Sequence, residues 1–319
     1  MRKLFLLCVF LWPVLAFGGE PLMLINPSRE TFFNFPSAIV PDKTVTVFLP
    51  EPAVPLHQKY PVVFLLGAGP KEAAAVQQVL DQSQHKALLV GINTDEKDLQ
   101  DTDKLVAFFT QELVPYINSN YTTLETPSLR ALAASGAAGA KAVAALLAHK
   151  KIAARAALVN PGEKPVSFAG SAADLRVLLV GPREQLLVQQ KTLSDMDKQY
   201  GVHYATQIAS TSFLLEKLNL DYLFAQSAEV ELKKVEGEVV PDQISLGAGQ
   251  TATLSATALL ANRMRFDVVP AGLRLSPPYL EWQPAIGQLK PLPGAGAGKV
   301  KISFAVDKIN FTQKIRLKK

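Results

Sequence analysis

The sequence predicts an α/β fold followed by a smaller all-β region, and three observations point to this class. Continuous apolar runs alternate with helical patterns through the first two thirds of the chain, which is typical of a mostly parallel sheet with helices on both faces. After residue 228 the helical patterns stop, and short β-type runs recur roughly every ten residues. The 319 residues suffice for about two domains, and 48% of them are apolar, so a sizeable core is expected.

The chain begins with the pattern of a secretory signal peptide. A basic start is followed by the apolar run 4–15 and by a small-residue ending at Ala16-Phe17-Gly18. Because this run is too short for a comfortable membrane span, an uncleaved anchor is the less favoured alternative. We therefore expect residues 1–18 to be removed and the protein to be exported, either to the periplasm or to the outside. The only cysteine, Cys8, leaves with this segment, which excludes thiol and disulfide chemistry from the mature chain.

Charge is distributed unevenly along the mature chain. Residues 229–319 hold 13 basic and 8 acidic residues, whereas residues 19–228 hold 18 and 20. A mildly basic C-terminal region can contact an anionic surface such as an envelope polymer or lipid headgroups, although such a bias is more often a solvated face. The sequence does not interleave basic and aromatic residues, so nucleic acid is not expected as a partner. No later segment is long enough to span a membrane.

Residues 19–228 are expected to form the α/β domain. Residues 19–36 lack clear periodicity and are interpreted as an N-terminal arm, and residues 93–103 are interpreted as an acidic, polar loop. This acidic loop lacks the glycine and terminal glutamate of a calcium loop, so no metal is predicted. The predicted strands are 44–49, 61–66, 87–92, 156–159, 175–180 and 202–208, and the predicted helices are 71–83, 105–118, 185–200 and 212–225.

Residues 229–319 are expected to form a separate β-sandwich of immunoglobulin-like kind. Trp282 is interpreted as a core residue of this sandwich rather than a ligand platform, and residues 293–298 as a flexible hairpin loop. The predicted strands are 230–234, 243–246, 251–258, 264–269, 279–282, 299–306 and 311–317.

Residues 129–149 combine a short buried strand, a turn of small residues and an alanine-rich helix. This is the shape of a nucleophile elbow, the strand–turn–helix that presents a catalytic serine at the top of a sheet. The expected G-x-S-x-G is absent, since the chain reads Ala133-Ala134-Ser135-Gly136-Ala137. The segment therefore raises the question of whether it belongs to a working hydrolase.

The chain resembles the putative esterase family of α/β-hydrolases, which includes esterase D-like, feruloyl-esterase-like and siderophore-esterase-like enzymes. The likeness covers roughly residues 37–225, and the C-terminal region lies outside it. It rests on Val45-Thr-Val-Phe-Leu-Pro50, Tyr60-Pro-Val-Val-Phe-Leu-Leu66, Leu89-Val-Gly-Ile92, Glu112-Leu-Val-Pro-Tyr-Ile117, Asn120-Tyr121-Thr122 and Leu129-Arg-Ala-Leu-Ala133. The resemblance implies a serine, an acid and a histidine in that chain order, together with an oxyanion hole and no cofactor.

Two registers compete for the position of the nucleophile. In the favoured one Gly136 takes the serine's place, and Gly139, Ala142 and His149 then match family positions in the following helix. In the other register Ser135 is the nucleophile. The elbow residue of the family has a positive φ, which glycine adopts without a Cβ penalty, so a protein that no longer needs the hydroxyl loses no stability with glycine there.

The other catalytic positions give mixed signals. Glu184 fits the acid position after the strand 175–180, but a solvated glutamate at a helix N-terminus explains it equally well. The family histidine should lie near Thr211, where the chain has none, and His203 is interpreted as a structural residue in a strand. None of His57, His85 and His149 is a plausible base. The candidate oxyanion loop is Gly67-Ala68-Gly69, where the family commonly has His-Gly-Gly.

These observations favour an exported esterase-like protein that has lost hydrolase activity and acts as a binding or scaffold module in the cell envelope, with an envelope protein or glycan as partner. A hydrolase that uses Ser135 with Glu184 and an unorthodox base is the first alternative. A carbohydrate-binding protein whose former active-site pocket holds sugar is the second.

Overall fold

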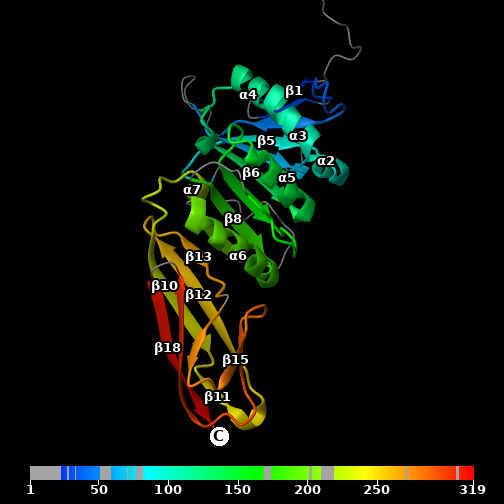
Figure 1. Ribbon diagram of the computed structural model, residues 1–319. Coiled ribbons are helices and arrows are strands. Elements are labelled where there is room, and N and C mark those ends of the chain that lie inside the picture. Colours follow the sequence, from blue (N-terminus) through cyan, green and yellow to red (C-terminus); the bar gives the residue numbers. More distant parts are fainter. Residues whose placement is uncertain are drawn as a thin grey trace, which may run out of the picture.

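The computed structural model describes residues 23–26, 29–32, 34–50, 59–69, 71–72, 74–76, 82–168, 174–200, 203–209, 219–270, 272–306 and 309–319. Figure 1 shows an elongated molecule with helices and strands at one end and, apart from the 3-10 turn Leu246–Ala248, strands at the other. Within these described residues, no helix is both long and apolar enough to cross a membrane.

The α/β part is built on a large mixed sheet whose central strands are parallel. The strand order is β1-β2-β3-β5-β4-β6-β7-β8-β9, and every neighbouring pair from β5 to β9 is parallel. The strands are β1 (Met23–Asn26), β2 (Arg29–Phe32), β3 (Val45–Phe48), β4 (Val62–Leu66), β5 (Leu88–Ile92), β6 (Arg130–Ser135), β7 (Arg155–Val159), β8 (Arg176–Gly181) and β9 (His203–Ile208). The prediction of parallel central strands is therefore confirmed, whereas the sheet as a whole is mixed, because antiparallel strands extend it at both ends.

The apolar runs form the central strands because both faces of the sheet are covered. Every residue of β4, β5 and β7 is buried, as expected for strands between two layers. One hydrophobic core includes residues of α3 (Thr102–Phe108), α5 (Gly136–Ala148) and α6 (Arg183–Tyr200). A second core is formed by the alternate residues of the same strands, which point to the other face of the sheet, and it includes α7 (Leu220–Leu223).

Two segments differ from the sequence predictions. The predicted irregular arm contains β1 and β2, an antiparallel pair whose second strand extends the sheet alongside β3. The predicted acidic loop 93–103 instead contains α2 (Glu96–Gln100) and the start of α3. Asp95 caps α2 by accepting from the Asp98 amide at 2.8 Å, and Asp98 accepts from the Asp95 amide at 2.9 Å. The carboxylates thus satisfy helix N-terminal amides in a reciprocal capping arrangement.

The predicted helix 105–118 is divided into three pieces. After α3 come a π-helical turn, Phe109–Leu113, and α4, Val114–Asn120. Of the helix predicted for residues 71–83, the described residues 71–72 and 74–76 are helical and residues 82–83 are not, and the other residues of this segment lie outside the described ones. Residues 212–218 of the helix predicted for 212–225 also lie outside the described residues. The C-terminal end of the latter is the short helix α7.

The C-terminal region consists of strands in two sheets that enclose one core. One sheet has the order β11-β18-β17-β14, in which β11 pairs with β18 in parallel and the other pairs are antiparallel. Trp282 packs against the shared core and donates to the Pro270 carbonyl at 3.1 Å. The strands are β10 (Leu232–Val240), β11 (Gln243–Ser245), β12 (Ala252–Leu260), β13 (Arg265–Asp267), β14 (Arg274–Ser276), β15 (Leu280–Gln283), β16 (Gln288–Pro291), β17 (Gly298–Val306) and β18 (Ile309–Lys318). Two of them, β14 and β16, were not predicted.

The two parts are joined through β9 and β13. Asp267 of β13 pairs in antiparallel register with Thr206, and its carboxylate accepts from the Ile208 amide at 2.7 Å. Phe266 packs edge-on against Tyr222, with ring centroids 4.9 Å apart, inside a core whose other buried members, Leu260 apart, belong to the α/β part. The parts therefore share both a sheet edge and buried apolar surface.

Candidate functional site

The elbow lies at the carboxyl edge of the sheet, where β4, β5 and β6 end side by side. Ser135 is the last residue of β6 and has an extended backbone with φ −115° and ψ 150°. Gly136 opens α5 with φ +74°. Gly136 is thus the positive-φ residue between this strand and this helix, and Ser135 precedes it with an extended backbone.

The Cβ direction of Gly136 faces open space. A Cβ built on Gly136 would have no non-neighbouring atom within 4 Å, whereas a Cβ on Gly139 would lie 2.9 Å from the Cβ of Ala134. A side chain at 136 would therefore project outward without a clash, although its backbone would be strained. Ser135 is exposed, but its hydroxyl makes no capping hydrogen bond to α5.

Two amides of the candidate oxyanion loop are already hydrogen-bonded within the protein. The Gly67 amide donates to the hydroxyl of Thr94 at 2.8 Å and to the Ile92 carbonyl at 3.1 Å. The Ala68 amide donates to the same carbonyl at 3.2 Å. An oxyanion hole requires donors aimed at the reacting oxygen, and these two amides instead point to the neighbouring strand. Gly69 has limited space, since a Cβ there would lie 3.0 Å from a carboxylate oxygen of Glu72.

The candidate acid, Glu184, is an exposed residue in the first turn of α6. Two neighbouring glutamines of the same helix were missed by the sequence reasoning. Gln185 accepts from the Gly162 amide at 3.1 Å, and Gln189 accepts from the Val166 amide at 3.0 Å while donating to the Lys164 carbonyl at 2.7 Å. They tie the loop after β7 to α6, a contact between segments about twenty residues apart that no local pattern reveals.

No histidine in the described part of the chain lies at the carboxyl edge. His203 is the first residue of β9 and pairs with Arg176. It therefore lies at the opposite end of its strand, about 16 Å from the carboxyl edge. His149 is exposed at the far end of α5, about 20 Å from the elbow. His57 and Thr211 lie outside the described residues.

His85 lies before β5, near the amino edge, in a cluster with Ser83 and Asp221. The imidazole Nδ1 lies 2.9 Å from the Asp221 carboxylate, and the Ser83 hydroxyl donates to the same oxygen at 2.6 Å. Because the hydroxyl is bonded to the carboxylate and not to the imidazole, this trio lacks the serine–histidine hydrogen bond of a nucleophilic triad. Burial raises the pKa of Asp221, but the hydrogen bonds from Ser83, His85 and the Gln84 amide outweigh burial and hold it below its ordinary value.

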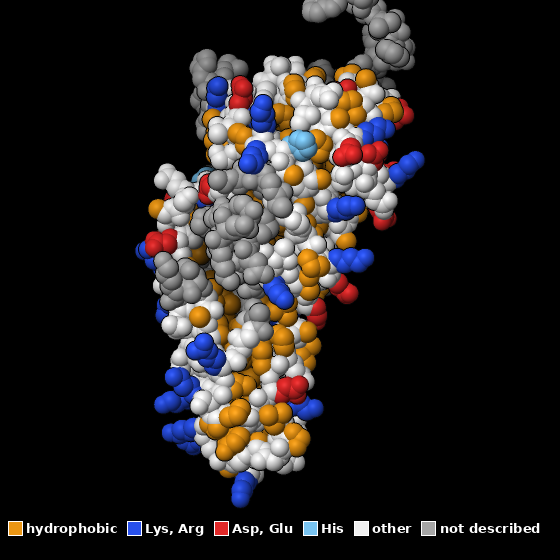
Figure 2. Space-filling view, in the orientation of Figure 1, with side chains coloured by type: hydrophobic (Ala, Val, Ile, Leu, Met, Phe, Trp, Pro, Cys, Tyr) orange, Lys and Arg blue, Asp and Glu red, His pale blue; other side chains and the backbone are white. Residues whose placement is uncertain are grey.

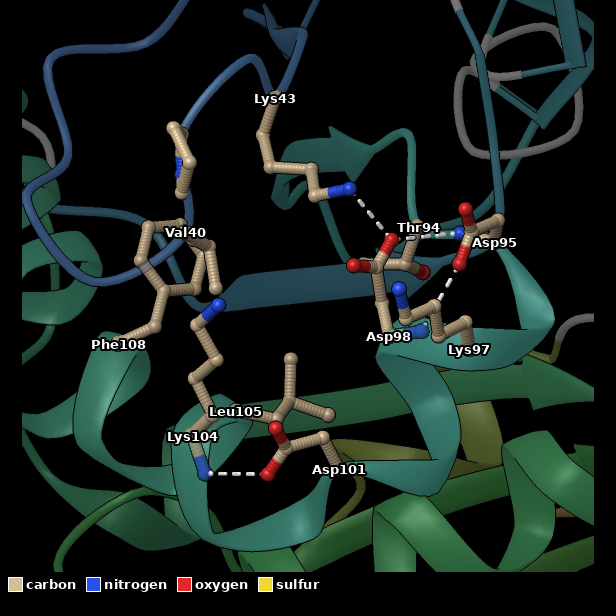
Figure 3. A pocket seen from close by; sticks show the side chains of 11 residues that line it. Val40, Lys43, Thr94, Asp95, Lys97, Asp98, Asp101, Lys104, Leu105 and Phe108 are labelled. Atoms are coloured by element: carbon tan, nitrogen blue, oxygen red, sulfur yellow. Dashed lines mark hydrogen bonds and ion pairs between the residues drawn. The ribbon is translucent and has the colours of Figure 1, made fainter.

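A cavity of about 280 Å³ opens beside the end of β5, between the 40–43 loop and helices α2 and α3 (Figure 3). Its apolar wall is formed by Val40, Leu105 and Phe108. Its polar wall carries equal numbers of lysines and aspartates, which are Lys43, Lys97, Lys104, Asp95, Asp98 and Asp101. The described residues contain no group of acidic, histidine or cysteine side chains arranged to hold a metal ion.

Most of the cavity's carboxylates have structural partners. Asp98 lies between Lys43, whose ammonium is 2.5 Å away, and the Asp95 amide (Figure 3). Asp101 caps α3 by accepting from the Lys104 amide at 3.2 Å. Thr94 connects this cavity to the candidate oxyanion loop, because it lines the cavity and accepts from Gly67. The cavity and the elbow thus belong to one edge of the sheet.

Known proteins are similar to this part of the chain. Residues 37–174 match the model of the family described as putative esterase. No curated protein matches the sequence. Similar solved structures include the BES protein from Bacillus cereus, with 13% identity, a TM-score of 0.44 and coverage of 60% of this chain and 91% of that chain. An S-formylglutathione hydrolase from Agrobacterium tumefaciens has 10% identity, a TM-score of 0.44 and coverage of 61% and 93%.

Proposed function

We propose that this chain, whose residues 37–174 belong to the putative esterase family, is an exported esterase-like protein that does not hydrolyse esters and acts as a binding or scaffold module in the cell envelope. The observation that carries the proposal is the glycine at the elbow. Gly136 has the positive φ of the nucleophile position and carries no hydroxyl. The neighbouring Ser135 has an ordinary extended backbone and precedes that position by one residue.

The surroundings of the elbow support the same reading. A serine nucleophile needs a base within hydrogen-bond reach, about 3 Å, or through one water. His203 begins at the opposite end of its strand, and the Gly67 and Ala68 amides already have carbonyl or hydroxyl acceptors. Removing one member of a triad typically lowers the rate by about four powers of ten, so a site without nucleophile, base and oxyanion donors would retain little activity.

A binding role uses the features that remain. The cavity beside β5 has an apolar wall and a polar wall with three lysines and three aspartates, which suits a small ligand with both polar and apolar groups. The C-terminal strands, in our proposal an immunoglobulin-like sandwich, then present a second surface to envelope partners. Hydrolysis by Ser135 is the competing function, and the exposure of that side chain at the strand end favours it.

Labelling with a fluorophosphonate probe followed by mass spectrometry separates these functions. We expect no labelled serine in the wild-type protein, and no difference between wild type and Ser135→Ala. Gly136→Ser should fold, with a strain cost of about 1–2 kcal/mol, and should also stay unlabelled because no base activates the new hydroxyl. An active serine esterase treated in parallel controls for the probe. Stoichiometric labelling of Ser135 in the wild type would overturn the proposal.

A further inference from the structure

We propose that the outward face of the β11-β18-β17-β14 sheet docks on an anionic lipid bilayer, and we call it the basic face. This proposal goes beyond the esterase-like part and is independent of the elbow. Strand alternation directs Val300, Ile302 and Ile315 into the core, so the residues between them point to solvent. The basic face carries six exposed cationic side chains, which are Arg274, Lys299, Lys301, Lys314, Arg316 and Lys318.

The register places like charges directly opposite each other. Lys299 of β17 pairs with Arg316 of β18, and Lys301 pairs with Lys314 one step further along the same two strands. Like charges at directly opposed positions destabilise a sheet. Four cations in two adjacent cross-strand pairs therefore cost the isolated protein stability, a cost that an anionic partner would offset.

The basic face contains no acid that could neutralise these cations. Its remaining outward residues within the four strands are Gln243, Ser245, Ser276, Ser303, Ala305, Asn310 and Thr312. Among the residues that the structure describes, no ion pair involves any of the six cations. Unsatisfied positive charge is thus a property of the whole face.

The other sheet of the same region shows the opposite arrangement. Glu236 accepts from Lys234 at 3.0 Å and from Arg265 at 2.7 Å, and Lys233 pairs with Glu231 at 2.6 Å. One face of the region therefore neutralises its cations internally, and the other does not. This contrast argues against a uniform excess of lysine as the explanation.

A flat bilayer suits the layout of the charges better than a sugar chain does. Neighbouring strands are about 4.8 Å apart and alternate residues along a strand about 7 Å apart, so the cations spread over three strands in two dimensions. The outward positions carry no aromatic side chain on which a sugar ring could stack. Figure 2 shows Lys and Arg side chains down the flank of the C-terminal region on which β18 lies in Figure 1. Clustered cations strengthen attachment to anionic lipid roughly fivefold each.

Vesicle co-sedimentation of the full mature chain tests the proposal. We expect binding to phosphatidylcholine vesicles containing about a third phosphatidylglycerol, no binding to pure phosphatidylcholine, and a steep loss of binding as salt rises and screens the charges. A variant with Lys299, Lys301, Lys314 and Arg316 all changed to Gln should bind about 600-fold more weakly, which is about fivefold for each of the four cations. A control with Lys233, Lys234, Arg265 and Lys290 changed to Gln removes the same net charge and should bind within a few-fold of wild type.

Thermal melting separates a folding defect from a binding defect. Removing opposed like charges should leave the melting temperature of the basic-face variant unchanged or higher at low salt. The single variants Lys301→Gln and Lys314→Gln should each bind the vesicles about fivefold more weakly, and they test the proposal with less perturbation of the fold.

Equal losses of binding in the basic-face and control variants would overturn the proposal. So would binding to soluble dextran sulfate without binding to the anionic vesicles, which would point to a polymer partner instead.

Discussion

Gly136 and Gly67 both have positive φ angles, +74° and +77°, and they follow β6 and β4, which are neighbours in the sheet. At such positions glycine avoids the steric cost that a Cβ imposes. The small-residue turn at 133–137 predicted the positive φ of Gly136 from sequence, because a turn between strand and helix needs this conformation and glycine adopts it without a Cβ penalty. What the sequence could not show is that the Gly67 and Ala68 amides bond to Ile92, since that contact depends on the positions of two separate strands.

At the residue scale, Asp221 provides a test of how a partly buried carboxylate contributes to stability. Its pKa is held below the ordinary value, so its stabilising contribution is full above the unfolded-state pKa, about 3.9, and is lost as pH falls through the folded-state pKa. Asp221→Asn should lower the free energy of unfolding by about 1 kcal/mol near pH 7, a small value because the side chain is one-third exposed.

Urea denaturation between pH 2.5 and 7 measures this difference. The gap between wild type and Asp221→Asn should narrow as pH falls below about 4. Glu163→Gln, an exposed loop carboxylate, is the matched control and should leave stability within about 0.5 kcal/mol at every pH. A gap that stays constant or widens in acid would show that the Asp221 charge is not the source of the stability.

At the scale of elements, the apolar runs predicted the central strands well because burial on both faces leaves a signal within each run. The capped helix α2 was missed because an acidic segment is usually solvated, and its capping box depends on local geometry rather than on hydrophobic periodicity. Three strands, β6, β7 and β8, each begin with a buried arginine. Arg176 donates to the Tyr222 and Ala225 carbonyls, which are remote in sequence, so no local pattern predicts it.

The contact between α5 and β6 depends on a glycine. Gly139→Val should lower the free energy of unfolding by about 2 kcal/mol, because even its Cβ would lie 2.9 Å from the Cβ of Ala134. Gly247→Ala is the control, since a Cβ there meets nothing within 4 Å, and its effect should stay within about 0.5 kcal/mol. Chemical denaturation measures both variants. Equal stability of the two would mean that α5 can shift away from β6 without cost.

At the scale of the whole molecule, the expected boundary at residue 228 separates the helical part from the β-only part but does not separate their cores. β13 pairs with β9, and Phe266 and Leu260 pack in a cluster with Tyr222. This arrangement couples the two parts energetically. Neither contact could be predicted from sequence. Each joins segments about forty to sixty residues apart, and the local pattern of each segment predicts its own strand or helix but not its distant partner.

Calorimetry tests that coupling. The wild type should unfold in one transition, and Phe266→Ala should cost about 3–4 kcal/mol and separate the transition into two. Phe304→Ala removes an equally buried ring from the C-terminal core alone, so it should lower the transition temperature while leaving one transition. Two independent transitions in the wild type would contradict the coupling, and an unsplit transition in Phe266→Ala would contradict the role of Phe266 in it.

The most direct test of the account is the turnover of short-chain p-nitrophenyl and feruloyl esters by the purified mature protein, with Ser135→Ala and Gly136→Ser assayed beside it. The elbow carries glycine, no described histidine lies at the carboxyl edge, and the amides of the candidate oxyanion loop already donate to acceptors within the protein. All three proteins should therefore give rates within about tenfold of one another and close to the buffer background. A wild-type rate about a thousandfold above background that disappears in Ser135→Ala would contradict it.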